Sequence, residues 1–430
     1  MLELNVFIEI NGQNTFVGRI ESLDNKNACF TYDEEYIKNS NSRAISISLP
    51  LSNKPYDFKH TKNFFDGLLP EGFTRKCVAE ISQIDADDYL SLLSLLGNEC
   101  LGAIKIENQK NSSANTDYIE LSIDEIQKLA QEGASEAADI VTKSHLSLTG
   151  ASGKVGLYYN EANKKWYLPV GNAPSTHIIK QSHVRLKRIV ANEQLCMLTA
   201  KALGIAVPES FIIKNDSVND GSILFASKRY DRMLKNGVNT INGIPVPLRL
   251  HQEDFSQASG IPSECKYEKN NGRYLEQMFN LLRNYSADPI VDQLKLWNIC
   301  IFNYLIGNTD NHIKNLSLLY SEDLKTIRLS PAYDIVSTMI YDSSSENMAL
   351  SIGNKYNINC IGKEDFRIEA EKCGIGEKIA MKTFDSMVER FSSSLKASAD
   401  ILKNDGFDDV SDICKSIMKR GGIKHYRNIL

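Results

Sequence analysis

The residues best suited to chemistry lie in one short polar stretch, residues 307–315, which reads GNTDNHIKN. Asp310 and Asn315 stand five positions apart, which is the D-x-x-x-x-N spacing of the protein-kinase catalytic loop. In that loop the aspartate accepts the proton of the substrate hydroxyl, and the asparagine holds a magnesium ion. The spacing therefore indicates phosphoryl transfer, with Asp310 as the base and Asn315 as a metal ligand.

A further carboxylate follows in residues 329–334, which read LSPAYD. Asp334 stands where protein kinases carry the main Mg²⁺ ligand on ATP. Mg²⁺ prefers hard oxygen ligands and keeps several waters, so a carboxylate, an amide oxygen and phosphate oxygens would satisfy it. The local sequence leaves an alternative open, in which Asn308, Asp310 and Asn311 only form Asx turns.

Two apolar segments must position this loop. Residues 294–306 read LKLWNICIFNYLI, and their apolar side chains recur with the spacing of a helix. Gly307 is expected to end that helix in the left-handed conformation. The following LSLLY, residues 316–320, reads as a strand. A polar loop fixed between a buried helix and a buried strand is a rigid platform for chemistry.

A second segment of interest contains glycines and precedes a predicted β-hairpin. Residues 143–159 read KSHLSLTGASGKVGLYY, and Gly150 and Gly153 could let backbone N–H groups surround phosphates. The segment is not a Walker A loop, because Leu148 and Val155 stand where that motif needs Gly and Ser or Thr. An ordinary glycine-containing hairpin is the alternative.

The next strand-like segment, PSTHIIK, ends in Lys180, which could pair with the α- and β-phosphates of a nucleotide. The alternative is a solvated lysine on an edge strand. Glu193, near the start of the following predicted helix, could brace Lys180 or could only favour the helix N-terminus. Residues 228–231, KRYD, follow an apolar strand, as expected of a hinge that reads adenine with its backbone.

The composition is that of a soluble globular protein, with 430 residues, of which 42% are hydrophobic and 24% charged. No segment is long and apolar enough to cross a membrane, and the N-terminal MLELNVFIEI lacks the basic region of a signal peptide. We therefore expect a cytoplasmic protein. The nine cysteines include no C-x-x-C and are expected to be reduced, and the seven histidines show no metal-binding spacing.

The net charge of −5 argues against a surface that binds nucleic acid as a whole, although it leaves room for a local basic patch. A modest basic cluster near the C-terminus is better explained as a solvated helix face than as such a patch. The cluster consists of Lys415, Lys419, Arg420, Lys424, His425 and Arg427.

The pattern of elements changes along the chain. Residues 1–106 read as a β-rich N-terminal subdomain, and a polar link, ENQKNSSANT, follows at 107–116. Residues 117–230 read as a β-rich lobe with the candidate phosphate-binding loop, and residues 231–430 read as an all-helical lobe. The prediction is an α+β fold with two lobes and an extra N-terminal β subdomain.

Taken together and in order, the motifs resemble the HipA family, the serine/threonine-kinase toxins of bacterial toxin–antitoxin systems. The resemblance extends over essentially the whole chain. The motifs are SLTGASGK at 147–154, PSTHIIK at 174–180, NEQLCMLTAKALGI at 192–205, KRYDR at 228–232, RLHQEDFSQASG at 249–260, GNTDNHIKN at 307–315 and SPAYD at 330–334.

The resemblance implies a protein-kinase-like fold that uses ATP and Mg²⁺. It implies that Asp310 is the catalytic base and that Asn315 and Asp334 hold Mg²⁺. It also implies a set of nucleotide-binding residues around the phosphates and the adenine. That set is Gly150, Ala151, Ser152, Gly153, Lys154, Lys180, Lys228, Arg229, Tyr230, Asp231, Gln252, His312 and Tyr333.

In the family, a serine of the phosphate-binding loop is autophosphorylated, which ejects the loop and inactivates the kinase. Ser147 is the matching position. The loop reads T-G-A-S-G-K here, whereas the family usually has A-G-A-Q, so Thr149 and Ser152 are rival sites. A phosphoserine adds roughly −1.5 to −2 charges and could not remain against ATP phosphates.

The resemblance further implies a protein substrate, an aminoacyl-tRNA synthetase, and a DNA-binding antitoxin of the HipB type as partner. DNA would then be contacted only through the antitoxin, and no membrane is implied. Two other functions stay open. One is a kinase of a small-molecule hydroxyl, and the other is a co-repressor scaffold with little kinase activity.

Overall fold

The chain falls into two units in a computed structural model of the protein. Unit 1 consists of Met1–His183, Gly221–Ser263 and Leu319–Ile327, and unit 2 consists of Val184–Asp220, Glu264–Leu318 and Arg328–Leu430. The structure describes residues 2–22, 24, 27–108, 116–131, 154–181, 186–214, 223–235, 237, 239–270 and 272–426.

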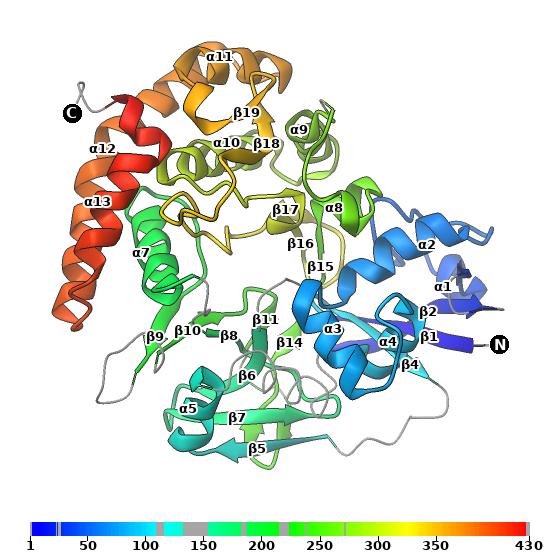
Figure 1. The fold of residues 1–430 in the computed structure, drawn as a ribbon. Coiled ribbons are helices and arrows are strands. Elements are labelled where there is room, and N and C mark those ends of the chain that lie inside the picture. Colours follow the sequence, from blue (N-terminus) through cyan, green and yellow to red (C-terminus); the bar gives the residue numbers. More distant parts are fainter. Residues whose placement is uncertain are drawn as a thin grey trace. The chain divides into compact units, whose positions relative to one another are not determined.

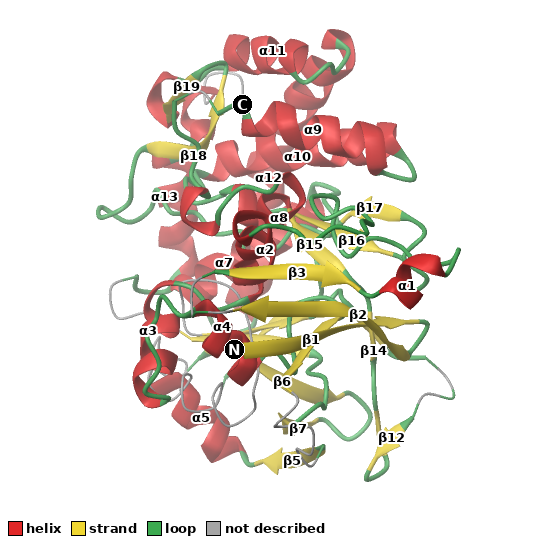
Figure 2. Ribbon diagram, turned by 90° about the vertical axis from the view of Figure 1, so that its right-hand side faces the viewer, coloured by secondary structure: helices red, strands yellow, loops and turns green. Residues whose placement is uncertain are grey.

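Unit 1 begins with an antiparallel sheet whose strand order is β3-β2-β1-β4. Its first hairpin turns at Asn11 and Gly12, which both have positive φ angles, as tight hairpin turns require. The inward side chains of β1, Leu4, Val6 and Ile8, are fully buried. Figure 2 shows β1, β2 and β3 side by side. The elements of this part are β1 (Leu2–Ile10), β2 (Gln13–Ser22), β3 (Ala28–Tyr32), α1 (Glu34–Lys38), α2 (Phe58–Phe65), η1 (Asp66–Leu68), α3 (Gly72–Ile81), α4 (Tyr89–Leu96) and β4 (Ile104–Asn108).

Unit 1 continues with a second antiparallel sheet, in which β5, β7, β6, β8 and β10 are neighbours in that order. Tyrosines form a small core against it, and the ring centroids of Tyr118 and Tyr158 lie 4.6 Å apart. The elements are β5 (Asp117–Leu121), α5 (Ile123–Gln131), β6 (Lys154–Asn160), β7 (Lys165–Val170), β8 (His177–Gln181), β10 (Leu224–Lys228), β11 (Arg232–Met233), β12 (Thr240–Ile241), β13 (Ile244–Pro245), β14 (Leu248–Arg249), β15 (Gln252–Asp254) and α8 (Phe255–Ser259).

Unit 2 is built around α12, a helix of 28 residues that packs against α7, α10, α11 and α13. Figure 1 shows α13 running beside α12. Helix α10 is apolar on most of its surface, and Leu296, Trp297 and Phe302 are fully buried. The elements are α7 (Ile189–Ala202), β9 (Ser210–Ile213), α9 (Tyr274–Tyr285), α10 (Pro289–Ile306), η5 (Ile313–Asn315), β18 (Asn347–Ile352), β19 (Lys355–Asn357), η6 (Ile358–Cys360), α11 (Lys363–Lys372), α12 (Glu377–Asn404), α13 (Val410–Arg420) and η7 (Gly422–Tyr426).

Three of the five points at which the chain passes from one unit to the other lie within short elements. These elements are η4 (Ser263–Cys265), β16 (Ser317–Tyr320) and β17 (Ile327–Leu329). Strand β16 confirms the strand that was predicted directly after the polar loop.

The prediction that residues 231–430 are all helical was wrong in one respect, because they include strands, above all the hairpin β18–β19. Its turn residues, Gly353 and Asn354, both have positive φ angles. The apolar run before the turn is too short for its periodicity to distinguish a strand from a helix. The nine cysteines, which all lie in described parts of the chain, are free thiols. None of the described helices is long and apolar enough to span a membrane.

Candidate active site

The loop that carries Asp310 begins where α10 ends, at Gly307. This residue has a φ angle of 72°, and its N–H donates to the carbonyl of Tyr304 at 3.1 Å. The predicted glycine stop is therefore confirmed. A Cβ atom at this position would lie 2.9 Å from the Cβ of Met339, so glycine is required for space as well as for conformation.

Hydrogen bonds inside the loop fix its backbone. The side-chain amide of Asn308 donates to the side-chain oxygen of Asn303 at 2.8 Å, and its own oxygen accepts from the N–H of Asp310 at 3.1 Å. The N–H and the hydroxyl of Thr309 lie 2.8 and 2.7 Å from the hydroxyl of Thr338. Asn308 thus forms an Asx-type turn, and this turn presents Asp310.

Asn315 is bound directly to the backbone of Asp310. Its Nδ2 donates to the carbonyl of Asp310 at 3.0 Å, and the N–H of His312 donates to the same carbonyl at 2.8 Å. Because the amide nitrogen makes this bond, the side-chain oxygen of Asn315 is the group that can serve a metal ion. The two predicted catalytic-loop residues are therefore held together as one rigid element.

Asp334 has a φ angle of 56°, a left-handed conformation that is strained for a residue other than glycine. The backbone on both sides of it is fixed. The N–H of Ala332 donates to the carbonyl of Ala206 at 2.8 Å, and the N–H of Ser337 donates to the side-chain oxygen of Asn192 at 3.2 Å. Strained residues persist where the surroundings over-determine them, which is common at functional sites.

Tyr333 joins the Asp334 segment to the catalytic loop. Its hydroxyl donates to the carbonyl of Lys314 at 2.9 Å and accepts from the hydroxyl of Ser317 at 2.6 Å. These bonds place Asp334 and Asn315, the two predicted metal ligands, on segments that are directly linked. The predicted contact between Tyr333 and a nucleotide stays a prediction.

The oxygen ligands that Asn315 and Asp334 offer suit Mg²⁺ better than they suit a metal ion that is coordinated only by protein side chains. Among the described residues, no group of three or more His, Cys, Asp or Glu side chains is arranged to hold a metal ion. One carboxylate and one amide oxygen, from Asp334 and Asn315, would leave the remaining positions to phosphate oxygens and water, as Mg²⁺ prefers.

In unit 1, two of the predicted phosphate ligands stand opposite each other. Lys154 opens β6 and pairs in register with Lys180 of β8. Residues directly opposite in an antiparallel pair point to the same face of the sheet. The Lys180 ammonium lies 5.5 Å from the ring centre of Phe225, a cation–π distance. The strand pair therefore concentrates positive charge on one face.

The predicted hinge, residues 228–231, contains part of a buried ion-pair network. The guanidinium of Arg229 lies 2.7 Å from the carboxylate of Asp231 and 3.1 Å from that of Glu99. The N–H of Arg229 donates to the carbonyl of Thr176 at 2.8 Å. Because the side chains of Arg229 and Asp231 are engaged inside unit 1, they are not available to a nucleotide. The predicted contact of this segment's backbone with adenine stays a prediction.

Glu99 is the centre of that network, and sequence analysis missed it. Arg232 and Arg249 also bind its carboxylate, at 2.8 and 2.9 Å. Burial alone would raise the pKa of Glu99, but Arg232, Arg249 and Arg229 together lower it to about 2. No local pattern could have revealed it, because its three arginines lie 130 to 150 residues away along the chain.

The remaining predicted nucleotide ligands of unit 1 also make contacts within it. The amide nitrogen of Gln252 donates to Asp231 at 3.3 Å, and its oxygen accepts from the hydroxyl of Tyr230. The ammonium of Lys228 lies 2.8 Å from the carboxylate of Glu161. Their contacts with a nucleotide stay predictions.

The predicted phosphate-binding loop lies outside the described residues, which resume at Lys154. The positions concerned are Ser147, Thr149, Gly150, Ala151, Ser152 and Gly153. Glu193 is buried in α7. The bracing of Lys180 by Glu193 would join residues of different units and stays a prediction.

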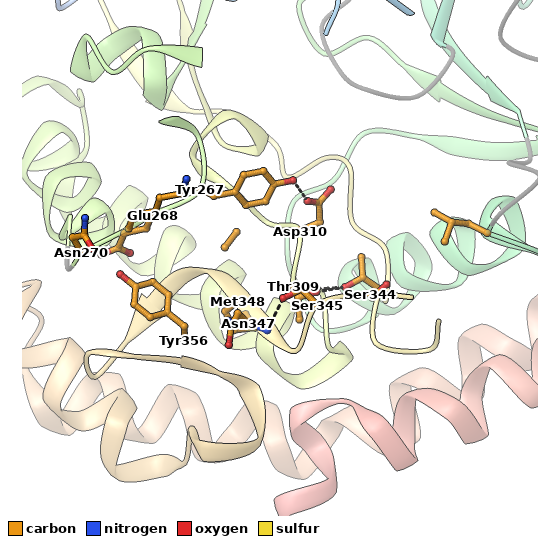
Figure 3. Close-up of a pocket in the computed structure, with 14 residues that line it drawn as sticks. Tyr267, Glu268, Asn270, Thr309, Asp310, Ser344, Ser345, Asn347, Met348 and Tyr356 are labelled. Atoms are coloured by element: carbon orange, nitrogen blue, oxygen red, sulfur yellow. Dashed lines mark hydrogen bonds between the residues drawn. The ribbon is translucent and has the colours of Figure 1, made fainter. Parts of the chain in front are cut away.

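A pocket of about 690 Å³ in unit 2 opens beside Asp310 (Figure 3). The hydroxyl of Tyr267 points at Asp310 and donates to its carboxylate. The ring of Tyr267 meets the ring of the buried His312 edge-on, with centroids 5.2 Å apart. Sequence analysis included His312 but missed Tyr267, because CKYEK carries no motif and precedes the loop by many residues.

Two protein-family models match this chain. Residues 146–395 match the HipA-like C-terminal domain, and residues 8–107 match the HipA N-terminal domain. The first match alone covers more than half of the chain. The two matched segments include every motif that carried the resemblance.

Two curated proteins are similar over most of their length. Y4mE of Sinorhizobium fredii, named only as a candidate kinase, is 31% identical over 391 residues, which are 89% of this chain and 88% of that protein. HipA of Shewanella oneidensis, named a serine/threonine-protein kinase toxin, is 24% identical over 380 residues, 85% of this chain and 83% of that protein.

A solved structure has the same fold. A chain of the Shewanella oneidensis complex of HipA, HipB and operator DNA matches with a TM-score of 0.79 at 20% identity, over 100% of this chain and 98% of that chain. This match confirms the predicted α+β, two-lobed, kinase-like fold.

Proposed function

The chain belongs to the HipA family, and from this premise we propose that it is an ATP- and Mg²⁺-dependent serine/threonine protein kinase that acts as the toxin of a toxin–antitoxin module. The observation that carries the proposal is the loop after α10, where Asp310 lines a pocket while Asn315 is bound to the Asp310 backbone. The names of Y4mE and of the Shewanella protein, both of which describe a kinase, support this activity.

Phosphoryl transfer needs positioning and charge neutralisation more than covalent catalysis, and the described residues suit those tasks. The carboxylate of Asp310 would accept the proton of the acceptor hydroxyl. The side-chain oxygens of Asn315 and Asp334 would hold Mg²⁺, which when bound neutralises negative charge on the phosphates. Lys154 and Lys180 would attract the phosphates of ATP.

The partners follow from the family. The solved Shewanella complex contains HipB and operator DNA, which supports a HipB-type antitoxin as the partner and DNA contact through that antitoxin. The acceptor is proposed to be an aminoacyl-tRNA synthetase, and this rests on the family resemblance alone. Growth arrest would follow from the inactivated synthetase.

Autophosphorylation is the proposed means of self-inactivation. The acceptor would be Ser147, with Thr149 and Ser152 as rivals. A phosphate there would repel the ATP phosphates through roughly −1.5 to −2 added charges. The loop would then leave the nucleotide.

The test is intact-mass and peptide mass spectrometry of the full chain after incubation with MgATP, beside Asp310→Ala. We expect the wild type alone to gain phosphate, and the phosphate to map to the loop. Incubation with a panel of aminoacyl-tRNA synthetases, followed by the same peptide mapping, would identify a trans acceptor.

Two outcomes would contradict the proposal. Transfer of phosphate to metabolites but to no protein would support a small-molecule kinase. The absence of any transfer, together with no thermal stabilisation by MgATP, would support the co-repressor scaffold.

A further inference from the structure

The pocket beside Asp310 lies entirely within unit 2. Its walls come from residues 267–270, from the catalytic loop and from the segment that leads into β18 (Figure 3). Because Asp310 lines this pocket, an acceptor hydroxyl that gives its proton to Asp310 can approach through it. A volume of about 690 Å³ is sufficient for an acceptor side chain and its neighbours.

One oxygen of the Asp310 carboxylate already accepts a hydrogen bond. The phenol of Tyr267 donates to Oδ1, and the side chain of Tyr267 itself is 41% exposed. A carboxylate offers about four lone-pair sites on its two oxygens, and this bond occupies one of them. Hydrogen bonds to ionised groups are about twice as strong as neutral ones and fix geometry accordingly.

Tyr267 is held in place from the side of the catalytic loop. The carbonyl of Lys266 accepts from the N–H of Ile313 at 3.4 Å, so the two backbones are joined next to the phenol. The ring packs edge-on against His312, and the ammonium of Lys266 lies 5.6 Å from the ring centre.

Tyr267 is also held from the other side, through the next residue. The N–H of Glu268 donates to the carbonyl of Ala349 at 2.9 Å. The buried carboxylate of Glu268 accepts from the N–H of Ser351 and from that of Arg273, both at 2.8 Å. Hydrogen bonds of Lys266 and Glu268 therefore fix the backbone on both sides of Tyr267, and this fixes the position from which its phenol reaches Asp310.

We propose that Tyr267 is a positioning residue for the transfer step. Its phenol holds Asp310 through Oδ1, so that Oδ2 receives the proton of the acceptor hydroxyl. As that O–H bond breaks, the acceptor oxygen bonds to the γ-phosphorus, and the bond from that phosphorus to the bridging oxygen breaks, so that ADP leaves with the electron pair. Tyr267 keeps its own proton throughout. The inference rests on the proposed kinase function.

The test variant is Tyr267→Phe, which keeps the ring with its His312 and Lys266 contacts and removes only the hydroxyl. The full-length protein is incubated with MgATP, and phosphate gain is followed by intact mass. We expect the maximal rate to fall about tenfold or more, because a misplaced base loses proximity to its proton. The MgATP concentration that gives half of the maximal rate should stay within about twofold.

Tyr274→Phe is the matched control. The phenol of Tyr274 belongs to the same stretch of chain but donates to the carbonyl of Cys265 at 2.8 Å, and it does not line the pocket. Its removal should change rate and half-saturation by no more than about twofold. Equal losses of rate in the two variants would show that Tyr267 has only a structural role and would overturn the inference.

A structural readout separates this inference from the proposed function. In crystals, the Asp310 carboxylate should adopt one conformation in the wild type and should rotate or become multiple in Tyr267→Phe. An unchanged carboxylate in the variant overturns the inference whether or not the enzyme is active. If the wild type transfers no phosphate, the proposed kinase function is contradicted. The crystal structures would still show whether the Tyr267 hydroxyl fixes the orientation of the Asp310 carboxylate.

Discussion

Lys154 of β6 and Lys180 of β8 are directly opposite each other in an antiparallel strand pair. Like charges in this arrangement destabilise a sheet, by up to roughly 1 kcal/mol. Such an arrangement is expected where the charges serve an anionic ligand. In the proposed function, this anionic ligand is the triphosphate of ATP.

We predict that Lys180→Met weakens MgATP binding about tenfold or more, because a charged contact to phosphate is lost. The melting temperature without nucleotide should stay close to that of the wild type, because methionine keeps an unbranched side chain of similar length. Titration calorimetry and thermal unfolding measure these effects. The control is Lys165→Met on β7, an exposed lysine 2.7 Å from Glu120. A Lys180 variant that melts early and still binds MgATP like the wild type contradicts the prediction.

Asp334→Asn is predicted to raise the Mg²⁺ concentration needed for half-maximal phosphorylation, about tenfold or more, because a charged hard ligand becomes neutral. The fold should be retained, since asparagine tolerates the left-handed conformation that Asp334 adopts at φ 56°. Activity is measured across a magnesium titration at fixed ATP.

Asp323→Asn serves as the control for Asp334→Asn, because the Asp323 carboxylate accepts hydrogen bonds from Ser321 and Lys325 within unit 1. It should leave the magnesium requirement unchanged. If Asp334→Asn also leaves the requirement unchanged, Asp334 is not a metal ligand.

Gly307→Ala is predicted to destabilise the protein by about 3 kcal/mol, since the left-handed backbone and a crowded methyl group add their costs. The Cβ would approach Met339 to 2.9 Å and the Cα of Gly421 to 3.1 Å. Gly204 has a φ angle of 85° with nothing within 4 Å, so Gly204→Ala isolates the conformational cost of about 1 kcal/mol. Urea unfolding compares the two. Equal costs would mean that Met339 and Gly421 move aside freely.

The catalytic loop could be predicted from sequence because its signals are local. An apolar helical run, a glycine stop and a short strand bracket Asp310 and Asn315 within a few residues, and α10, Gly307 and β16 were confirmed. The positions of these residues are set by their neighbours in the chain. Where this is the case, the local sequence pattern is sufficient to predict the structure.

The parts that could not be predicted depend on contacts between distant residues. Tyr267 reaches Asp310 across 43 residues, and Glu99 meets its arginines across 130 or more. Neither Tyr267 nor Glu99 belongs to a sequence pattern from which such a distant partner could be predicted. The β18–β19 hairpin was missed for a related reason, because a short apolar run among helices takes its conformation from packing.

Glu99→Gln is predicted to destabilise unit 1 by about 3 to 5 kcal/mol, because it leaves buried arginines without their shared carboxylate. Glu120→Gln is the matched control, since Glu120 and Lys165 form an ion pair whose side chains are both 51% exposed. Its cost should stay below about 1 kcal/mol. Urea denaturation of both variants makes the comparison, and similar midpoints would refute the central role of Glu99.

The last prediction concerns Glu253, a fully buried carboxyl group of unit 1. Burial raises its pKa from 4.5 to about 7, although hydrogen bonds from Ser46, Tyr320 and the N–H of Ile47 oppose that rise. Between these two values the folded protein binds a proton that the unfolded chain has released. The contribution of this group to the free energy of unfolding is therefore fully present below pH 4.5 and is lost as the pH rises through 7.

Glu253→Gln cannot titrate and should remove this dependence. Measured by urea unfolding, the wild type should lose about 3 kcal/mol relative to the variant between pH values of about 4.5 and 7.5. His177 and His251, whose pKa values burial lowers to about 4, act in the opposite direction. Both histidines are present in the two proteins, so their effects cancel in the difference. A difference that is constant with pH would show that Glu253 is ionised throughout and that its three hydrogen bonds outweigh burial.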